Sequence, residues 1–187
     1  HHVDPMHPEY AELPARKVDG AAAKALMDEA GMADFEHELI SIDDAWRKDT
    51  TDAVAAQLRD AGIKVKRTIL PGSTFWNDWA KYPFSSTNWN HRPLGVQIWA
   101  LAYRTGEAWN EFGYSNPEFD ALLERALATA DIEARRTLMA EGQAMIQNDG
   151  VTIQPYWRSL YNHTKEGLEG GSHHISFEVR PEQLHWT

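Results

Sequence analysis

Helical and strand-like hydrophobic patterns alternate along most of this chain, and that alternation limits the folds it can adopt. Apolar residues recur at helical spacing over 45–61 and 118–130, whereas over 35–42 and 63–70 they alternate with polar residues as in a strand. The alternation over 35–42 predicts a strand with one face buried. Strands that alternate with helices pack as layers around one core. The sequence therefore predicts an α/β layered domain over 18–150.

Local signals place the ends of these elements. Asp19 is a suitable N-cap for a helix over 21–30. Pro117 fits the first turn of a helix, with Asn116 or Ser115 as its cap. The remaining expected elements are short helices over 73–79 and 94–103, a longer helix over 132–147, and strands over 84–89, 151–161 and 175–179.

The two ends of the chain lack such regularity. Residues 1–17 are rich in proline and show no periodicity, so we expect an extended leading segment there. The residues beyond 160 include too many apolar side chains for a solvated linker. These side chains are Tyr161, Leu168, Ile175, Phe177, Val179, Leu184 and Trp186.

Composition excludes several classes of function. The formal net charge is −10, which disfavours a nucleic-acid partner and mildly favours cationic ligands. The chain has no cysteine, which rules out disulfides, thiol nucleophiles and zinc sites built on cysteine. No apolar run approaches the roughly 20 residues needed to span a bilayer, and no signal-peptide pattern opens the chain.

Motifs for metal binding and catalysis are not found. None of the nine histidines belongs to an HExxH motif, since no histidine lies four residues after His37. The histidine pairs at 1–2 and 173–174 could hold at most an adventitious surface metal. The Gly-x-Ser-x-Gly elbow and the glycine-rich phosphate loop are also absent. We therefore expect no catalytic residue, no resident metal and no cofactor, with an unrelated α/β enzyme as the least favoured alternative.

Four segments in a fixed order resemble a known family. They are KALMDEAG at 24–31, VAAQLRDAGIKV at 54–65, YSNPEFDALL at 114–123 and IQPYW at 153–157. Together they resemble the C-terminal half of the extracytoplasmic solute-binding proteins that serve peptide- and nickel-type (family 5) ABC importers. The resemblance runs from about Pro14 to the last residue.

The resemblance implies a fold and a role. The implied fold is the C-terminal lobe of a type II periplasmic-binding-protein fold, a mixed sheet flanked by helices, without most of the N-terminal lobe that is its partner. Residues 18–150 would form the ligand-binding lobe, and residues 151–187 would return across a hinge into a C-terminal tail. The absence of a signal peptide is expected for such a C-terminal part.

The implied role is that of the substrate-binding component of an ABC importer in the periplasm. Such a protein captures a peptide-like or other small solute between its lobes and docks on a permease in the inner membrane. A signalling or chaperone-like receptor lobe on the same fold is the alternative. With the partner lobe missing, the apolar tail is expected to promote self-association of the chain.

The loop Trp89-Asn90-His91-Arg92 is the first candidate for ligand binding. It follows a predicted strand and precedes a predicted helix, where α/β folds place ligand sites. Arg92 can grip a carboxylate by two parallel hydrogen bonds, and Trp89 can stack on a ligand. Peptide-binding members have an acid after this tryptophan, for the α-amino group of the peptide. Here no acid lies between Trp89 and Pro93, which favours an anionic, polyhydroxyl or otherwise different solute.

Trp109 and Asn110 are the second candidate, because the resemblance places their segment against the ligand cleft. Trp109 would be a stacking platform, and Asn110 would donate and accept hydrogen bonds. Both candidate groups have a structural alternative. Trp89 could be a core residue with Arg92 an ordinary surface cation, and Trp109 could be tucked under the helix that follows.

Overall fold

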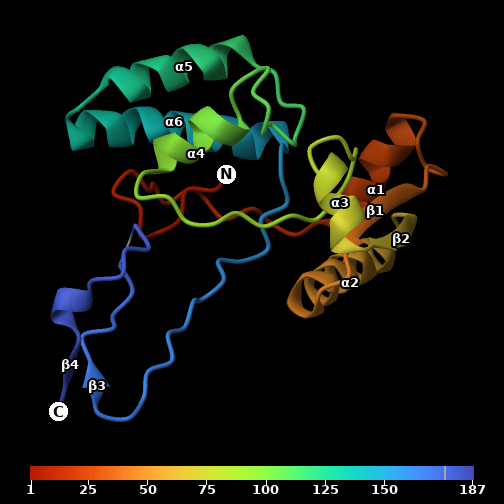
Figure 1. Cartoon of the computed structure of the whole chain (residues 1–187). Helices are drawn as coiled ribbons and strands as arrows, with labels where there is room; N and C mark the ends of the chain where they lie inside the picture. The colour runs from red at the N-terminus through yellow and green to blue at the C-terminus, as the bar shows by residue number, and fades with distance from the viewer. Residues whose placement is uncertain (175) are drawn as a thin grey trace. The chain divides into compact units, whose positions relative to one another are not determined.

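The computed structural model describes residues 1–174 and 176–187. The described chain divides into two compact units, both seen in Figure 1. Residues Pro14–Trp89 form the first, called here the sheet unit. The second, called the helical unit, combines His1–Leu13 with Asn90–Thr187.

This division differs from the expected ranges of 1–17, 18–150 and 151–187. The difference has a physical cause at the start of the chain. The first 13 residues pack among the helices that follow Asn90, so they belong to the helical unit although they are distant from it in sequence.

The sheet unit is built on a β–α–β arrangement. β1 (His37–Ile42) and β2 (Val65–Leu70) pair in parallel, and α2 (Ala45–Asp60) connects them (Figure 1). A parallel pair needs a long crossover connection, which this helix provides. α1 (Gly20–Glu29) and α3 (Gly72–Asp78) complete the unit. These elements confirm the predicted ones, with their ends within two residues of the expected positions.

Both faces of β1 are buried, whereas the sequence pattern predicted one. Leu39 packs against Ala55 of α2 on one face. Ile40 and Ile42 point to the other face and pack against Phe75, which is fully buried in α3. The prediction of a single buried face is therefore wrong, because α3 covers the second.

The strand predicted over 84–89 is reduced to an isolated parallel bridge between Ile40 and Ser85. The backbone of Ile40 makes both hydrogen bonds of this bridge, at 3.1 and 2.9 Å. Beyond it, the side chain of Asn88 accepts a hydrogen bond from Arg47 Nε at 2.7 Å. Asparagine has a low strand propensity, so the pairing does not extend further along the segment.

The helical unit contains α4 (Gly95–Ala102), α5 (Pro117–Ala128) and α6 (Ile132–Asp149), with α5 and α6 side by side in Figure 1. Asn116 caps α5, as predicted, by accepting hydrogen bonds from two first-turn N–H groups at 3.0 and 3.3 Å. Asp131 caps α6 with a bond of 2.9 Å. The described residues contain no helix with the length and hydropathy of a membrane span.

Aromatic side chains fill the core of the helical unit. Trp99, Tyr103 and Phe119 are fully buried, and the ring centroids of Trp99 and Phe119 lie 5.2 Å apart. Gly142 of α6 faces Trp99 so closely that a Cβ at this position would lie 2.6 Å from the indole ring. A larger residue there would force the tryptophan or the helix to move.

The leading segment contributes to the same core. The carbonyl of His1 accepts a hydrogen bond from Trp99 Nε1 at 3.0 Å. Glu9 is fully buried and accepts from the backbone N–H of Gly95 at 3.0 Å and from Arg135 Nη1 at 3.3 Å. Glu9 thereby satisfies an N–H at the start of α4 and pairs with a nearly buried cation.

The tail departs from the two strands predicted for it. Residues 151–161 contain no strand. Ile175 lies outside the described residues, and 176–179 are not in a strand. Gly167 and Gly170 adopt positive φ angles of 80° and 83°, which allow the chain to turn here. The short elements that do form are β3 (Leu168–Glu169), which pairs antiparallel with β4 (His185–Trp186), and the 3₁₀ helix η1 (Pro181–Gln183).

Candidate functional site

The predicted ligand loop begins at the last residue of the sheet unit. Trp89 is half-buried, and its ring centroid lies 6.1 Å from that of Trp79. Asn90, the first residue of the helical unit, is exposed. Trp89 is therefore neither fully enclosed in a core nor fully open to solvent.

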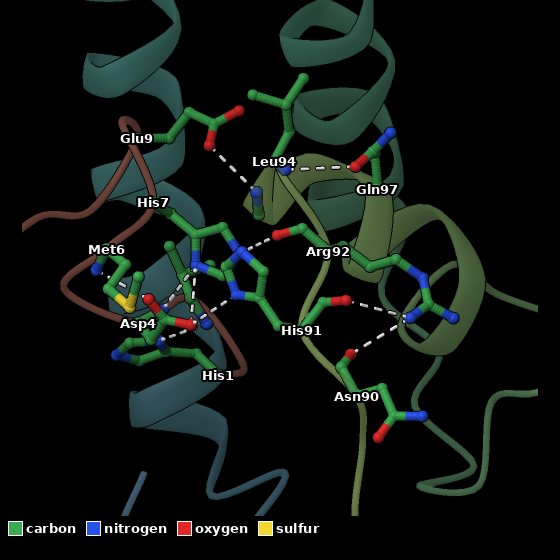
Figure 2. Close-up of polar contacts among 12 residues, drawn as sticks. His1, Asp4, Met6, His7, Glu9, Asn90, His91, Arg92, Leu94 and Gln97 are labelled. Atoms are coloured by element: carbon green, nitrogen blue, oxygen red, sulfur yellow. Dashed lines mark hydrogen bonds and ion pairs between the residues drawn. The ribbon is translucent and has the colours of Figure 1, made fainter. Parts of the chain in front are cut away.

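Arg92 is held against its own loop (Figure 2). Its Nη1 donates to the carbonyl oxygens of Asn90 and His91, both at 3.2 Å. A guanidinium carries five N–H donors, and these two bonds use the pair on Nη1. The Nε–Nη2 edge is the one that matches a carboxylate with two parallel hydrogen bonds. The loop thus orients the cation without using the edge needed to grip an anion.

His91 faces the leading segment. Its Nδ1 lies 3.2 Å from Asp4 Oδ2, and its ring stacks on that of His7 with centroids 4.7 Å apart. His7 in turn hydrogen-bonds through Nε2 to the carbonyl of Arg92 at 2.8 Å (Figure 2). The structure therefore brings His91 together with two residues that the sequence pattern did not connect to it.

Asn110 closes the loop between α4 and α5. Its Nδ2 donates to the carbonyls of Arg104 and Tyr114 at 3.0 and 2.8 Å, and its Oδ1 accepts from the backbone N–H of Tyr114 at 3.1 Å. Three hydrogen bonds to the backbone make Asn110 a structural amide. The adjacent Trp109 is 47% exposed.

We expect Asn110→Ala to lower the free energy of unfolding by about 1–3 kcal/mol, because the loop's backbone groups lose their partners. Asn77→Ala is the matched control, since Asn77 is exposed and its amide donates to the carbonyl of Ser73 within the same helix. Chemical denaturation followed by circular dichroism measures both. Equal effects of the two substitutions would contradict the structural role of Asn110.

Sequence reasoning missed Asp4 and His7 as neighbours of the ligand loop. They lie 87 and 84 residues before His91, in a segment expected to be extended. The available signal was the spacing of Asp4 and His7, three residues apart, which lets both side chains meet across one turn. Nothing in the pattern predicted the histidine that joins them from the other side.

Comparison with known proteins finds relatives among the substrate-binding proteins of peptide transport. No family model matches it. Among curated proteins it is similar to the dipeptide-binding protein DppE of Bacillus subtilis (strain 168), with 25% identity over 126 residues, 66% of this chain and 23% of the relative.

The solved structures that resemble this chain also include peptide-binding proteins. The dipeptide-binding protein of Pseudoalteromonas sp. SM9913 in complex with Met-Leu matches 79% of this chain with a TM-score of 0.69 and 20% identity. The ABC transporter-associated periplasmic binding protein DppA of Helicobacter pylori, in complex with the peptide STSA, matches 79% with a TM-score of 0.68 and 19% identity. The chain has the fold of these periplasmic binding proteins. The family resemblance found in the sequence is confirmed. The α/β class predicted from the hydrophobic pattern is confirmed as well.

The similarity covers part of each binding protein. This chain spans 32% of the Pseudoalteromonas structure, 31% of the Helicobacter structure and 23% of the curated relative. The shared fold therefore corresponds to about a third of a solved periplasmic binding protein.

Proposed function

We propose that this chain is the ligand-binding lobe of the substrate-binding component of an ABC importer. The observation that carries the proposal is the match of its fold, at a TM-score of 0.69 over 79% of the chain, to a dipeptide-binding protein in complex with its ligand. In this role the protein binds and releases a solute and catalyses no reaction. It acts outside the cytoplasm, in the periplasm, and delivers its solute to a permease in the inner membrane.

The second partner is an N-terminal lobe of the same protein. Solute-binding clefts bury most of their ligand, which requires walls on both sides. Closure of two lobes over the solute is a hinge motion that the ligand biases, and the closed form is the one that docks. The share of 31–32% that this chain covers in the solved relatives supports a second part of this kind.

The proposed solute is peptide-like, or another small molecule with an anionic group. The names of the relatives support a peptide, and the loop supports the anion. The hydrogen bonds of Arg92 to described residues leave its Nε–Nη2 edge unused, and no acid lies between Trp89 and Pro93 to pair with an α-amino group. Trp89, Asn90 and Arg92 are proposed to contact the solute, with Trp109 as a further stacking surface. His91 and Asn110, also expected among the ligand contacts, are better supported as residues that position the two loops.

Trp89→Ala and Arg92→Ala, made in the complete binding protein, test this assignment. Each should weaken solute binding by about 1.5–3 kcal/mol, roughly ten- to a hundredfold, because a stacked or charge-assisted contact is lost in the closed cleft. Calorimetric titration with a set of dipeptides that includes Met-Leu gives the affinities. Arg92→Lys, which keeps the charge but not the two-pronged geometry, should fall between wild type and Arg92→Ala.

Normal dipeptide affinity in both alanine variants would make the loop a scaffold and contradict the assignment. Circular dichroism separates this outcome from misfolding. If Trp89→Ala unfolds the protein, the tryptophan is a core residue and the structural alternative holds.

A further inference from the structure

Three side chains with metal-ligating atoms converge inside the helical unit. Asp4 Oδ2 lies 3.4 Å from His7 Nδ1 and 3.2 Å from His91 Nδ1 (Figure 2). One ligand atom from each of the three residues lies within 4.8 Å of the others. The cluster is well enclosed, because the side chain of His7 is fully buried and those of Asp4 and His91 are 13% and 16% exposed.

The distances match the edges of a coordination polyhedron. In a tetrahedral site with bonds of about 2.0–2.1 Å to nitrogen and oxygen, neighbouring ligand atoms lie about 3.3–3.4 Å apart. The two distances from Asp4 bracket this value. A single carboxylate with two neutral imidazoles offsets half of the charge of a divalent cation.

The hydrogen bond of His7 Nε2 leaves Nδ1 as the ring nitrogen that can coordinate a metal ion. Its Nε2 donates to the carbonyl of Arg92 at 2.8 Å, so the proton is on Nε2 and the lone pair is on Nδ1. Nδ1 also accepts from the backbone N–H of Asp4 at 2.8 Å, and a cation bound to Nδ1 would replace this hydrogen bond. Metal-bound histidines commonly donate their other ring N–H to a backbone carbonyl, which fixes the tautomer and the ring orientation.

One nitrogen of the cluster makes no hydrogen bond to the described residues. His91 Nε2 is buried and has no hydrogen-bond partner among the described residues. Because Nε2 makes no hydrogen bond to a described residue, the proton of His91 can move from Nδ1 to Nε2 without breaking a bond of Nε2, and Nδ1 can then bind a cation beside Asp4 Oδ2.

We propose that Asp4, His7 and His91 bind a divalent first-row transition-metal ion. Two imidazoles and one carboxylate favour Zn²⁺, Ni²⁺ or Cu²⁺ over Mg²⁺ and Ca²⁺, which prefer all-oxygen sites. The ion fastens the leading segment to the ligand loop, because Asp4 and His7 come from the first and His91 from the second. Metal binding thus stabilises the helical unit and fixes the backbone on which Arg92 is mounted.

Zn²⁺ titration of the full chain at neutral pH tests the proposal by calorimetry. Wild type should bind one Zn²⁺ tightly, and Asp4→Asn and His91→Ala should each weaken that binding at least about tenfold. The control is the double variant His173→Ala/His174→Ala, which removes the histidine pair of the tail and should bind like wild type. Co²⁺ in place of Zn²⁺ should show the intense visible absorption of a tetrahedral site, and Asp4→Asn should abolish it.

Thermal unfolding gives an independent readout. Zn²⁺ should raise the unfolding temperature of wild type and of the tail control but not that of Asp4→Asn. Unchanged Zn²⁺ affinity in both Asp4→Asn and His91→Ala would overturn the proposal, as would loss of binding in the tail control. If His91→Ala fails to fold, Asp4→Asn decides, because it preserves the shape of the aspartate and removes only the charge.

Discussion

Glu9→Ala should lower the free energy of unfolding by about 3–5 kcal/mol, a large effect for a residue that the sequence places in an extended segment. Glu9 is fully buried and joins two partners, the N–H of Gly95 and the guanidinium of Arg135. Its removal leaves a helix N–H unsatisfied and a cation that is only 14% exposed without its counter-charge.

Denaturant unfolding of Glu9→Ala, Glu9→Gln and Glu12→Ala measures this effect. Glu12 is exposed, so its substitution should change stability by no more than about 0.5 kcal/mol. Glu9→Gln should lie between the two, since glutamine can still accept from Gly95 but cannot neutralise Arg135. A Glu9→Ala variant as stable as Glu12→Ala would show that the leading segment is not part of the folded core.

Trp99→Ala should also lower the free energy of unfolding by about 3–5 kcal/mol. Trp99 is fully buried, its ring packs against Phe119, and the backbone of α6 lies close to it at Gly142. The substitution therefore leaves a cavity and also removes the hydrogen bond from Nε1 to the carbonyl of His1.

The matched control is Trp186→Ala, because Trp186 is 65% exposed in the tail. Its loss should cost less than about 1 kcal/mol. Thermal or chemical unfolding monitored by far-ultraviolet circular dichroism avoids the change in tryptophan fluorescence that both substitutions cause. Similar losses for Trp99 and Trp186 would contradict the core described for the helical unit.

Local chemistry made much of the fold predictable. The cap at Asn116 with Pro117 in the first turn, and the alternation of β1 with α2, depend on residues close in sequence. These predictions succeeded because capping and amphipathic periodicity act over a few residues. The same applies to the family resemblance, which rests on short segments in a fixed order.

Long-range packing decided what could not be predicted. The second buried face of β1 depends on α3, and the burial of Glu9 depends on Gly95 and Arg135, which lie 86 and 126 residues further along the chain. The strand predicted over 84–89 forms only a single bridge, between Ser85 and Ile40.

For the candidate site, too, some features follow from the local sequence and others depend on the folded chain. The proposed ligand roles of Trp89 and Arg92 rest on the sequence of the loop itself and stay predictions. The backbone bonds of Asn110 and the contact of His91 with Asp4 required the folded chain. A polar side chain named from sequence alone can therefore be either a ligand contact or a structural group, and only its partners separate the two.

Native mass spectrometry of this chain joined to its proposed N-terminal lobe tests the central claim, the proposed solute-binding role, most directly. Purified under non-denaturing conditions after exposure to an extract of its host, the protein should carry the additional mass of one small solute. Arg92→Ala should lose that mass while keeping its fold by circular dichroism. A wild-type protein that remains free of solute in the extract and in a saturating peptide mixture would contradict its assignment as a solute-binding component.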